Sequence, residues 1–393
     1  MKNNMDVTER ISLEPAFGKD ENGKDAVAIM LAADNNWAPY ASVMIQSIKD
    51  NASNDRNYDI VLVGDLSNNN KKLMESMAEE NIFIRVIDIR SLLEGIDLSI
   101  FATNLYYTVE TYYRFFIPYL FWRYDKVLYL DVDIVVCRDV AELFDTDMRD
   151  NWWAVVKSRP TDQLDELDLW ENDFLSYLRE VLRMKSAFDY FQAGVMVWNV
   201  KQCINDNVYE QLIDRLAEIK TPRFVDQCVM NSIANGKHIH WLHGKWNFQW
   251  WFAFSWGGPM TAGYTEMMSC LDNAYIIHFC SCIKPWNEPH RPNADKFWWY
   301  ARRSPFYETI LLKKTNTEIS HLRTEISHLR SEISHLRSEM GCHRNKDLPE
   351  ILPDKVTWFN YNKYRLLTNI TFGPLRKKYN AKRLAIKKIL KTK

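Results

Sequence analysis

Between residues 26 and about 312, short apolar runs alternate with longer stretches whose apolar positions recur at helical spacing. The short runs indicate β-strands and the longer stretches indicate helices. Regular alternation of the two predicts an α/β fold with a mostly parallel sheet flanked by helices. The expected strands are 27–33, 58–63, 82–87, 126–130, 153–156, 195–198 and 275–278, and the expected helices are 38–50, 70–81, 103–121 and 208–219.

A seven-residue repeat follows this region. Thr-Glu-Ile-Ser-His-Leu-Arg occurs at 317–323 and 324–330, and Ser-Glu-Ile-Ser-His-Leu-Arg follows at 331–337. Isoleucine falls at heptad position a and leucine at d, which favours a parallel two-stranded coiled coil. Glutamate at g and arginine at e place opposite charges where two helices would pair. We expect a coiled coil over 313–340 and a homodimer through 317–340; the alternative is an amphipathic helix packed on its own body.

The last segment, 341–393, concentrates positive charge. The chain holds 50 Lys and Arg against 51 Asp and Glu, a net charge of −1. Residues 355–393 contain twelve Lys and Arg and no Asp or Glu, so residues 1–354 carry a net charge of −13. From Leu375 onward, apolar residues recur among these cations at roughly helical spacing, which suits an anionic membrane surface. A solvated tail is the alternative, and nucleic acid is disfavoured because the acidic body would repel it.

The apolar runs, the N-terminal segment and the cysteines indicate the cellular location of the protein. No apolar run approaches the roughly 20 residues that a membrane-spanning helix needs, and the polar segment 1–25 lacks an export signal and is expected to be loose. Seven scattered cysteines are expected to be reduced thiols. Cys280-x-Cys282 could suggest zinc, but a second paired cysteine motif is missing. These features predict a cytoplasmic protein, held peripherally on the inner face of the cell membrane by its tail.

Two carboxylates follow one apolar strand. The segment from Val127 reads Val-Leu-Tyr-Leu-Asp-Val-Asp, with the acidic residues at Asp131 and Asp133. Residues i and i+2 of an extended chain point to the same side, so both carboxylates would face one site. Oxygen ligands of this kind suit Mg²⁺ or Mn²⁺ together with substrate phosphates, and open α/β sheets bind ligands at this edge. A solvated strand end is the alternative to a metal site.

Two further segments carry candidate binding groups. Asp34-Asn-Asn-Trp follows the first expected strand, where polar groups could bond a base or ribose and Trp37 could stack; a turn or helix N-cap is the alternative. His278, at the end of the last expected strand, could complete the metal site, and Lys284 could neutralise a phosphate. A structural histidine and a solvated lysine are the alternatives. No GxGxxG is present, so the dinucleotide-binding fingerprint is absent.

Taken together and in order, these segments resemble glycosyltransferase family 8, and most of all its bacterial lipopolysaccharide galactosyl- and glucosyltransferases. The resemblance covers about residues 26–286. It implies a GT-A fold, a UDP-sugar donor, Mn²⁺ (or Mg²⁺) and retention of the anomeric configuration. The segments that carry it are Asp34-Asn-Asn-Trp, the region of Arg114, Asp131-Val-Asp133, Phe-Gln-Ala-Gly at 191–194, Asp226-Gln227 and His278-x5-Lys284-Pro-Trp.

The resemblance also implies a role for each matching residue. Trp37 stands where the family more often has tyrosine, Gln192 where it has Asn or Asp, and Ser281 where it has glycine. Gln192 bears on which sugar is preferred. Ser281 bears on activity, because a glycine at that position would allow close approach of a phosphate. The implied metal ligands are Asp131, Asp133 and His278, the implied catalytic residues are Asp226, Gln227 and Arg114, and the implied UDP-sugar contacts are Ala32, Ala33, Asp34, Asn36, Trp37, Arg114, Val132, Gln192, Ala193, Cys280, Ser281 and Lys284.

The sequence therefore predicts a hexosyltransferase that moves galactose or glucose from a UDP-sugar to a glycan or glycolipid acceptor in lipopolysaccharide or surface-glycan synthesis. Attack from the face of the leaving group is favoured; a double displacement would use Asp226, because a neutral amide such as Gln227 is a poor nucleophile. The alternatives are a protein or capsule acceptor, a UDP-sugar hydrolase, and an inactive dimeric scaffold that binds sugar nucleotide or glycan. The expected domains are a polar extension (1–25), the transferase domain (26–312), the coiled coil (313–340) and the basic tail (341–393).

Overall fold

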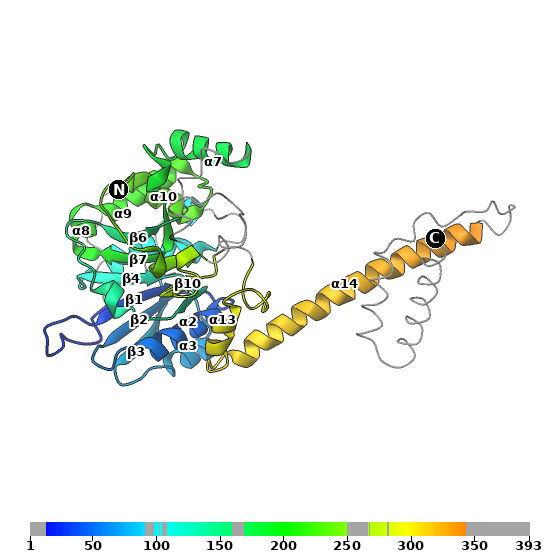
Figure 1. Cartoon of the computed structure of the whole chain (residues 1–393), viewed down its shortest axis with the longest axis horizontal. Coiled ribbons are helices and arrows are strands. Elements are labelled where there is room, and N and C mark those ends of the chain that lie inside the picture. Colours follow the sequence, from blue (N-terminus) through cyan, green and yellow to red (C-terminus); the bar gives the residue numbers. More distant parts are fainter. Residues whose placement is uncertain are drawn as a thin grey trace. The chain divides into compact units, whose positions relative to one another are not determined.

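The computed structural model describes residues 13–90, 98–101, 103, 108–158, 169–249, 266, 268–280 and 283–342. The chain divides into two compact units, Met1–Thr317 and Glu318–Lys393. The first unit is an α/β domain with a mixed, mainly parallel sheet flanked by helices (Figure 1). This is the fold class that the alternation of strands and helices predicts.

A seven-stranded sheet forms the centre of the first unit. Four neighbouring strand pairs are parallel, and the two pairs made by β7 (Phe191–Asn199) are antiparallel. Almost every residue of β1 (Val27–Ala32) and β2 (Tyr58–Val63) is buried, as expected for parallel strands covered on both faces. In spatial order the sheet is β3 (Ile82–Ile87), β2, β1, β4 (Lys126–Leu130), β7, β6 (Trp153–Lys157) and β8 (Ile239–Trp241).

A second, three-stranded sheet lies beside the first and supplies the other half of the site. Its order is β5 (Ile134–Val136), β10 (Ile276–His278) and β9 (Phe248–Gln249). β10 is antiparallel to β5 and parallel to β9. Because only three residues separate β4 from β5, the connection Asp131–Asp133 joins the two sheets.

Helices pack on both sets of strands. α2 packs against β5 and α13, α3 against β3, and α10 against β7 and α9. The α-helices are α2 (Ala38–Asn51), α3 (Asn68–Glu75), α5 (Ile117–Leu120), α6 (Ala141–Phe144), α7 (Leu169–Glu180), α8 (Val200–Asn205), α9 (Val208–Ile219), α10 (Val225–Ala234), α13 (Ala294–Ala301) and α14 (Tyr307–Cys342), and the 3₁₀ helices are η1 (Leu98–Ile100), η2 (Val109–Phe116), η4 (Ala187–Asp189) and η5 (Gly244–Asn247).

Several sequence expectations hold closely and others are corrected. The strands expected at 58–63, 82–87 and 126–130 are confirmed with the same bounds. The helix expected over 103–121 is wrong, because its described part is the 3₁₀ helix η2 followed by the short α5. Pro118 in the first turn of α5 cannot donate the hydrogen bond that a continuous α-helix needs there.

The start of the chain differs from expectation in its described part. The side chain of Leu13 is buried in the main core, with 5% of its surface exposed. The backbone N–H of Ala16 donates to the buried carboxylate of Asp59 over 3.1 Å. Leu13 and Ala16 therefore contact the domain, whereas a loose segment was expected there.

Candidate active site

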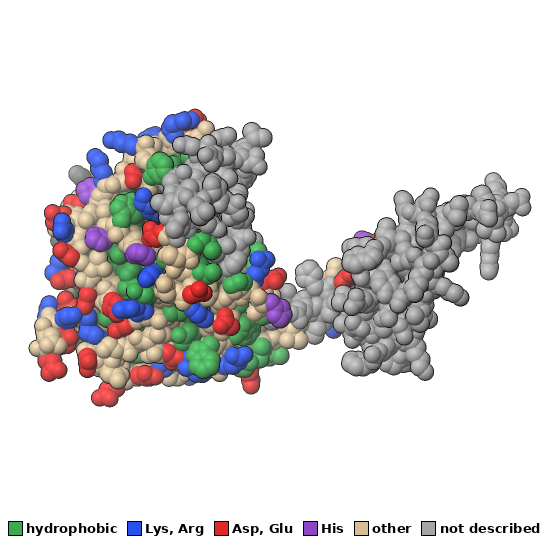
Figure 2. Space-filling model, viewed as in Figure 1, with side chains coloured by type: hydrophobic (Ala, Val, Ile, Leu, Met, Phe, Trp, Pro, Cys, Tyr) green, Lys and Arg blue, Asp and Glu red, His purple; other side chains and the backbone are tan. Residues whose placement is uncertain are grey.

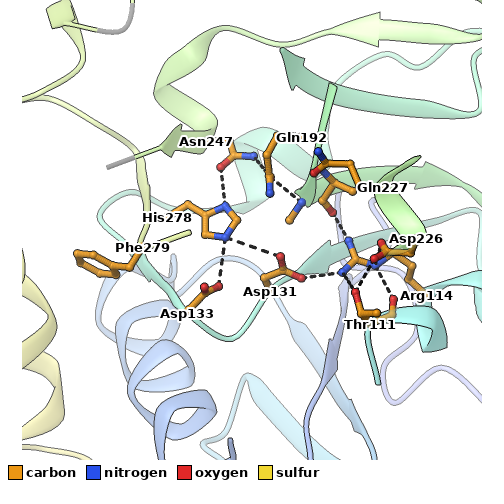
Figure 3. Close-up of polar contacts among 12 residues, drawn as sticks. Thr111, Arg114, Asp131, Asp133, Gln192, Asp226, Gln227, Asn247, His278 and Phe279 are labelled. Carbon is orange, nitrogen blue, oxygen red and sulfur yellow. Dashed lines mark hydrogen bonds and ion pairs between the residues drawn. The ribbon is translucent and has the colours of Figure 1, made fainter. Parts of the chain in front are cut away.

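Three metal-ligand side chains meet where the two sheets join. Asp131 directly follows β4, Asp133 directly precedes β5, and His278 ends β10. Antiparallel pairing sets His278 opposite Ile134, beside Asp133. The Nε2 atom of His278 lies 3.1 Å from Oδ1 of Asp133 and 3.7 Å from Oδ2 of Asp131 (Figure 3). One ligand atom from each residue lies within 4.8 Å of the others, a spacing that suits one divalent ion.

A buried lysine supports the acidic pair. The ammonium group of Lys284 contacts Oδ2 of Asp133 and donates to the carbonyl of Phe279 over 2.9 Å. Burial raises the pKa of Asp133, but the positive charge of Lys284 outweighs burial and holds that pKa well below its usual range. Asp133 is therefore ionised at neutral pH and able to ligate a cation.

Arg114, in η2, links the acidic pair to a third carboxylate, that of Asp226. Only 3% of Arg114 is exposed. Its Nη2 lies 2.8 Å from Oδ1 of Asp131, its Nε lies 2.9 Å from Oδ2 of Asp226, and its Nη1 donates to the carbonyl of Ala193. Burial lowers the pKa of Arg114, but Asp226 and Asp131 raise it above its usual range. The guanidinium fork fixes two carboxylates relative to each other.

Asp226 lies in the first turn of α10 and is as deeply buried as Arg114. The hydroxyl of Thr111 donates to its Oδ1, whereas Oδ2 has the ion pair with Arg114 but no aligned hydrogen bond. Burial raises the pKa of Asp226 to about 6, against the opposing effects of Arg114 and Thr111. The preceding residue, Val225, has φ 35°, in the left-handed region that β-branched side chains rarely adopt. The strain lies directly beside the candidate catalytic pair, as is common at active sites.

The raised pKa of Asp226 predicts a pH dependence of stability. A carboxyl whose pKa is higher in the folded state adds stability below its unfolded value, near 4, and loses that contribution as pH rises through about 6. The isosteric Asp226→Asn substitution removes the titration. The free energy of unfolding, measured in urea from pH 4 to pH 7, should therefore fall less steeply with pH in the variant than in the wild-type protein. Parallel pH profiles for the two proteins would contradict this reading.

These groups line one cavity of about 90 Å³. Gln192, Ala193 and Gly194 enter it from β7, and the backbone N–H of Ala193 donates to Oε1 of Gln227 over 3.0 Å. Cys280 lies at the edge, where burial raises the pKa of its thiol above the usual range. The lining residues are Thr111, Arg114, Asp131, Asp133, Gln192, Ala193, Gly194, Phe224, Val225, Asp226, Gln227, His278, Cys280 and Lys284.

Comparison with known proteins decides the family. The family model for glycosyl transferase family 8 matches residues 28–289, which include all of these lining residues. The chain belongs to glycosyltransferase family 8. It is a glycosyltransferase, of the class that transfers hexosyl groups.

Relatives of this family 8 chain agree in extent and fold. It is 24% identical over 284 residues to general stress protein A of Bacillus subtilis, covering 69% of this chain and 92% of that protein. It is 25% identical over 296 residues to a lipopolysaccharide 1,2-glucosyltransferase of Escherichia coli, covering 73% and 81%. The solved galactosyltransferase LgtC, bound to donor and acceptor sugar analogues, shares the fold with a TM-score of 0.58 at 23% identity, covering 71% of this chain and 96% of LgtC.

A second solved structure is similar over part of its length. The bifunctional glycosyltransferase WbbM superposes with a TM-score of 0.65 at 28% identity and covers 77% of this chain. The match spans only about half of WbbM, 53% of that chain. The remainder of WbbM has no counterpart in this match.

In this family 8 chain, the loop expected to grip the nucleotide is a tight turn before α2. Oδ1 of Asp34 accepts from the backbone N–H groups of Asn36 and Trp37, each over 2.9 Å. The Trp37 ring meets Trp286 edge-on at 5.9 Å, and the ammonium of Lys284 lies 5.7 Å from its centroid. The turn that stood as the alternative is therefore present, and it places Trp37 next to the lysine of the site.

The structure brings most of the expected site residues together. Ala32 ends β1, and the N–H of Ala33 donates to the carbonyl of Val63 at the same sheet edge. Val132, between the two acidic ligands, is nearly buried. Ser281 lies outside the described residues, as does Cys282. Residues that the sequence analysis did not single out are Thr111, Phe224, Val225 and Asn247.

The candidate ligand atoms of this family 8 chain fit a divalent cation. Two carboxylates and one imidazole nitrogen converge, and the imidazole nitrogen belongs to a nearly fully buried ring, with 1% of His278 exposed. Oxygen ligands with one imidazole suit Mn²⁺ and Mg²⁺, whereas structural zinc prefers several thiolates or imidazoles. Asp131, Asp133 and His278 are the residues that would hold the ion.

Proposed function

We propose that this chain is a retaining, metal-dependent hexosyltransferase that uses a UDP-sugar. It would transfer galactose or glucose to a saccharide acceptor in lipopolysaccharide or surface-glycan synthesis. The observation that carries the proposal is the convergence of Asp131, Asp133 and His278 beside two buried cations, Arg114 and Lys284. UDP release from UDP-sugars tests it, because transfer or hydrolysis liberates UDP and a binding scaffold does not.

The charges of the site suit departure of a diphosphate. When the sugar–phosphate bond breaks, negative charge grows on the leaving diphosphate. A bound Mn²⁺ or Mg²⁺ would supply Lewis-acid stabilisation of that charge. Lys284 lies within contact of Asp133 and is 6% exposed, so its charge acts in a site with little water to screen it. Arg114 adds a second buried cation on the other side of Asp131.

The environment of Asp226 supports attack from the leaving-group face over a double displacement. A nucleophilic carboxylate needs a free oxygen aimed at the anomeric carbon. One oxygen of Asp226 accepts from Thr111 and the other pairs with Arg114. A carboxylate held on both oxygens orients Arg114 better than it attacks, so we assign Asp226 a role in positioning and Gln227 a role beside the sugar.

The proposed donor and acceptor come from the relatives. One is named as a lipopolysaccharide 1,2-glucosyltransferase and another is a galactosyltransferase solved with donor and acceptor sugar analogues. Both names indicate hexoses. Glucose and galactose differ only at C4, so a panel of UDP-hexoses separates them in one assay.

We further propose that α14 pairs with a second copy of this chain. At position a, Ile326 is 48% exposed in the single chain. Ion pairs within one helix join residues three or four positions apart. Arg330 is five positions from Glu325 and two from Glu332, so it is not spaced to pair with either glutamate on its own helix. In a parallel pair, position g of one helix faces e of the next heptad of the other, which matches glutamate with arginine. An antiparallel pair would set like charges together.

Charge reversal tests the dimer while keeping the helix. Replacing Arg323, Arg330 and Arg337 by glutamate makes positions e and g both acidic, and the variant should be a monomer by light scattering. The reciprocal variant with lysine at 318, 325 and 332 should also be a monomer, and an equimolar mixture should recover the dimer mass because opposite charges again face each other. A wild-type monomer, or a dimer of the all-glutamate variant, would refute the pairing.

The tail 343–393 lies outside the described residues, and we propose from its charge that it binds an anionic membrane surface. On the face of the first unit in Figure 2, acidic and basic side chains are interspersed, so the twelve cations after residue 354 stand out. No helix among the described residues has the length and apolarity to cross a bilayer. Attachment through the tail would leave the enzyme peripheral, on the inner face of the cell membrane.

Truncation tests the anchor. Removing residues 375–393 should abolish sedimentation with vesicles that contain anionic lipid, because each Lys or Arg near such a surface contributes about 1 kcal/mol. Zwitterionic vesicles are the control and should bind neither protein. If the truncated chain still sediments with anionic vesicles, the tail is not the anchor.

A further inference from the structure

We propose that Gln192 and Asn247 are positioning residues that fix the tautomer of His278, and that this chain uses the carbonyl of Gln192 to build its metal site. A continuous set of hydrogen bonds runs from β7 through η5 to the end of β10 (Figure 3). The inference rests on the metal-dependent activity proposed above. Its test reads metal binding, so it can fail or succeed independently of transfer.

The series of hydrogen bonds starts from a group that can only act as a donor. The backbone N–H of Gly194 can only donate, and it lies 2.7 Å from one end of the Gln192 amide. That end must be the carbonyl oxygen, Oε1. The same Oε1 lies 2.6 Å from the side-chain amide of Asn247, so the Asn247 atom facing it must be the donating Nδ2. The orientation of both amides follows from one backbone group.

The orientation of Asn247 then determines which nitrogen of His278 carries the proton. With Nδ2 turned toward Gln192, the carbonyl Oδ1 of Asn247 faces Nδ1 of His278 at 3.0 Å. A carbonyl accepts only, so Nδ1 holds the hydrogen of the neutral ring. The lone pair is left on Nε2, which faces Asp131 and Asp133. A metal-ligating histidine is usually fixed in this way by a hydrogen bond from its other nitrogen.

Burial makes this arrangement rigid. Asn247 is fully buried and His278 is 1% exposed, so water cannot easily replace the partners of either side chain. A Cβ at Gly194 would lie 2.3 Å from Cε1 of His278 and 2.5 Å from Oδ2 of Asp131. Only glycine allows β7 to approach the ligands this closely. The strand that supplies the first donor is therefore packed directly against the ring it orients.

Gln192 has the reach that this role needs. Its side chain curls back so that Oε1 meets both Gly194 on its own strand and Asn247 on η5. Oε1 already accepts two hydrogen bonds, the number that its two lone pairs allow. It has no remaining capacity to accept from a sugar hydroxyl. The carbonyl of Gln192 therefore orients Asn247 and, through it, the metal ligand His278, and does not accept a hydrogen bond from the donor sugar.

Metal titration of the full-length protein tests the proposal. Mn²⁺ affinity is measured by calorimetry, and by the electron paramagnetic resonance signal of free Mn²⁺, at fixed pH without donor. Asn247→Leu and Gln192→Ala should each weaken Mn²⁺ binding by about 10- to 100-fold, the usual cost of losing a hydrogen-bond partner of a ligand. Gln192→Glu keeps an acceptor at the same length for both N–H donors and should bind Mn²⁺ within a few-fold of wild type.

A matched control separates positioning from general loss of packing. Asn51 is a partly buried asparagine whose amide donates to the carbonyl of Val136 and to the hydroxyl of Tyr300, away from the ligands. Asn51→Leu should leave Mn²⁺ affinity unchanged even if it lowers the melting temperature. Wild-type Mn²⁺ affinity in Gln192→Ala, or a wild-type protein that binds no Mn²⁺, would overturn the proposal. Normal Mn²⁺ binding without any UDP release would leave it standing and reject the transferase function instead.

Discussion

Replacing Asp133 by asparagine is expected to reduce UDP release on the order of 10³-fold, because it removes a ligand of the cation that would stabilise the leaving diphosphate. Asp133 sits between His278 and Lys284 and offers one oxygen to each. Asparagine keeps the shape but has no negative charge, and its single side-chain oxygen cannot both contact Lys284 and ligate a cation beside His278. The measurement is initial-rate UDP release at saturating donor and Mn²⁺.

An exposed aspartate gives the matched control for this experiment. Asp147 has a side chain 82% exposed, and its ion pair with Arg149 is 3.8 Å long. Asp147→Asn should therefore release UDP at the wild-type rate. Chelation of the metal by EDTA should lower the wild-type rate to that of Asp133→Asn, and added Mn²⁺ should restore only the wild-type protein. Wild-type activity in Asp133→Asn would remove Asp133 from the site.

Replacing Arg114 by methionine is expected to lower the free energy of unfolding by about 3–5 kcal/mol, because it leaves a buried carboxylate without its counter-charge. The guanidinium contacts Asp131 and Asp226, and Asp226 is buried to the same degree as Arg114. Methionine fills most of the volume, so the loss comes chiefly from charge. The measurement is urea unfolding at pH 7, where the carboxyl of Asp226, with its pKa of about 6, is mostly ionised in the wild-type protein; the variant must either bury an unpaired charge or take up a proton.

A second substitution and a surface control sharpen this prediction. Arg114→Met combined with Asp226→Asn removes both charges of the pair and should recover part of the stability while remaining inactive. Arg138 makes an i,i+4 ion pair with Glu142 on the surface, at 46% exposure, and Arg138→Met should cost less than about 1 kcal/mol. Equal losses from the buried and the surface arginine would contradict the account.

The sequence predicts the central strands well because of their burial. Apart from Asp59 and Lys126, β2 and β4 consist of buried apolar and aromatic residues, and such runs are visible without any structure. β7 was expected only from residue 195, because Gln192 and Gly194 interrupt its apolar run. Both residues line the site, as does Ala193 between them. The pattern fails where function replaces an apolar residue by a polar or small one.

The sequence also predicts part of the site and not the rest. The spacing of Asp131 and Asp133 after a strand carries a signal that can be read along the chain. Thr111 and Asn247 give no such signal, because each is a single polar residue whose partner lies far away, 115 positions for Thr111 and 31 for Asn247. Only the folding of η2 against α10, and of η5 beside β10, brings them to the site.

For the heptad segment, the sequence predicts the helix directly, whereas pairing of two helices needs a separate test. The heptads predict a helix through residue 340, and α14 extends continuously from Tyr307 to Cys342. Helix formation follows from local spacing, which one chain contains. Pairing depends on a second chain, so the homodimer remains a prediction until the mass is measured.

The most direct test of the central claim is UDP release from a panel of UDP-hexoses with Mn²⁺, compared between the wild-type protein and the Asp131→Ala/Asp133→Ala variant. We expect the wild-type protein to release UDP from one donor, UDP-galactose or UDP-glucose, slowly by hydrolysis and faster by transfer when a saccharide acceptor is present, and the variant to release none. No release by the folded wild-type protein from any donor, with glycan acceptors present, would contradict a transferase and favour a binding scaffold.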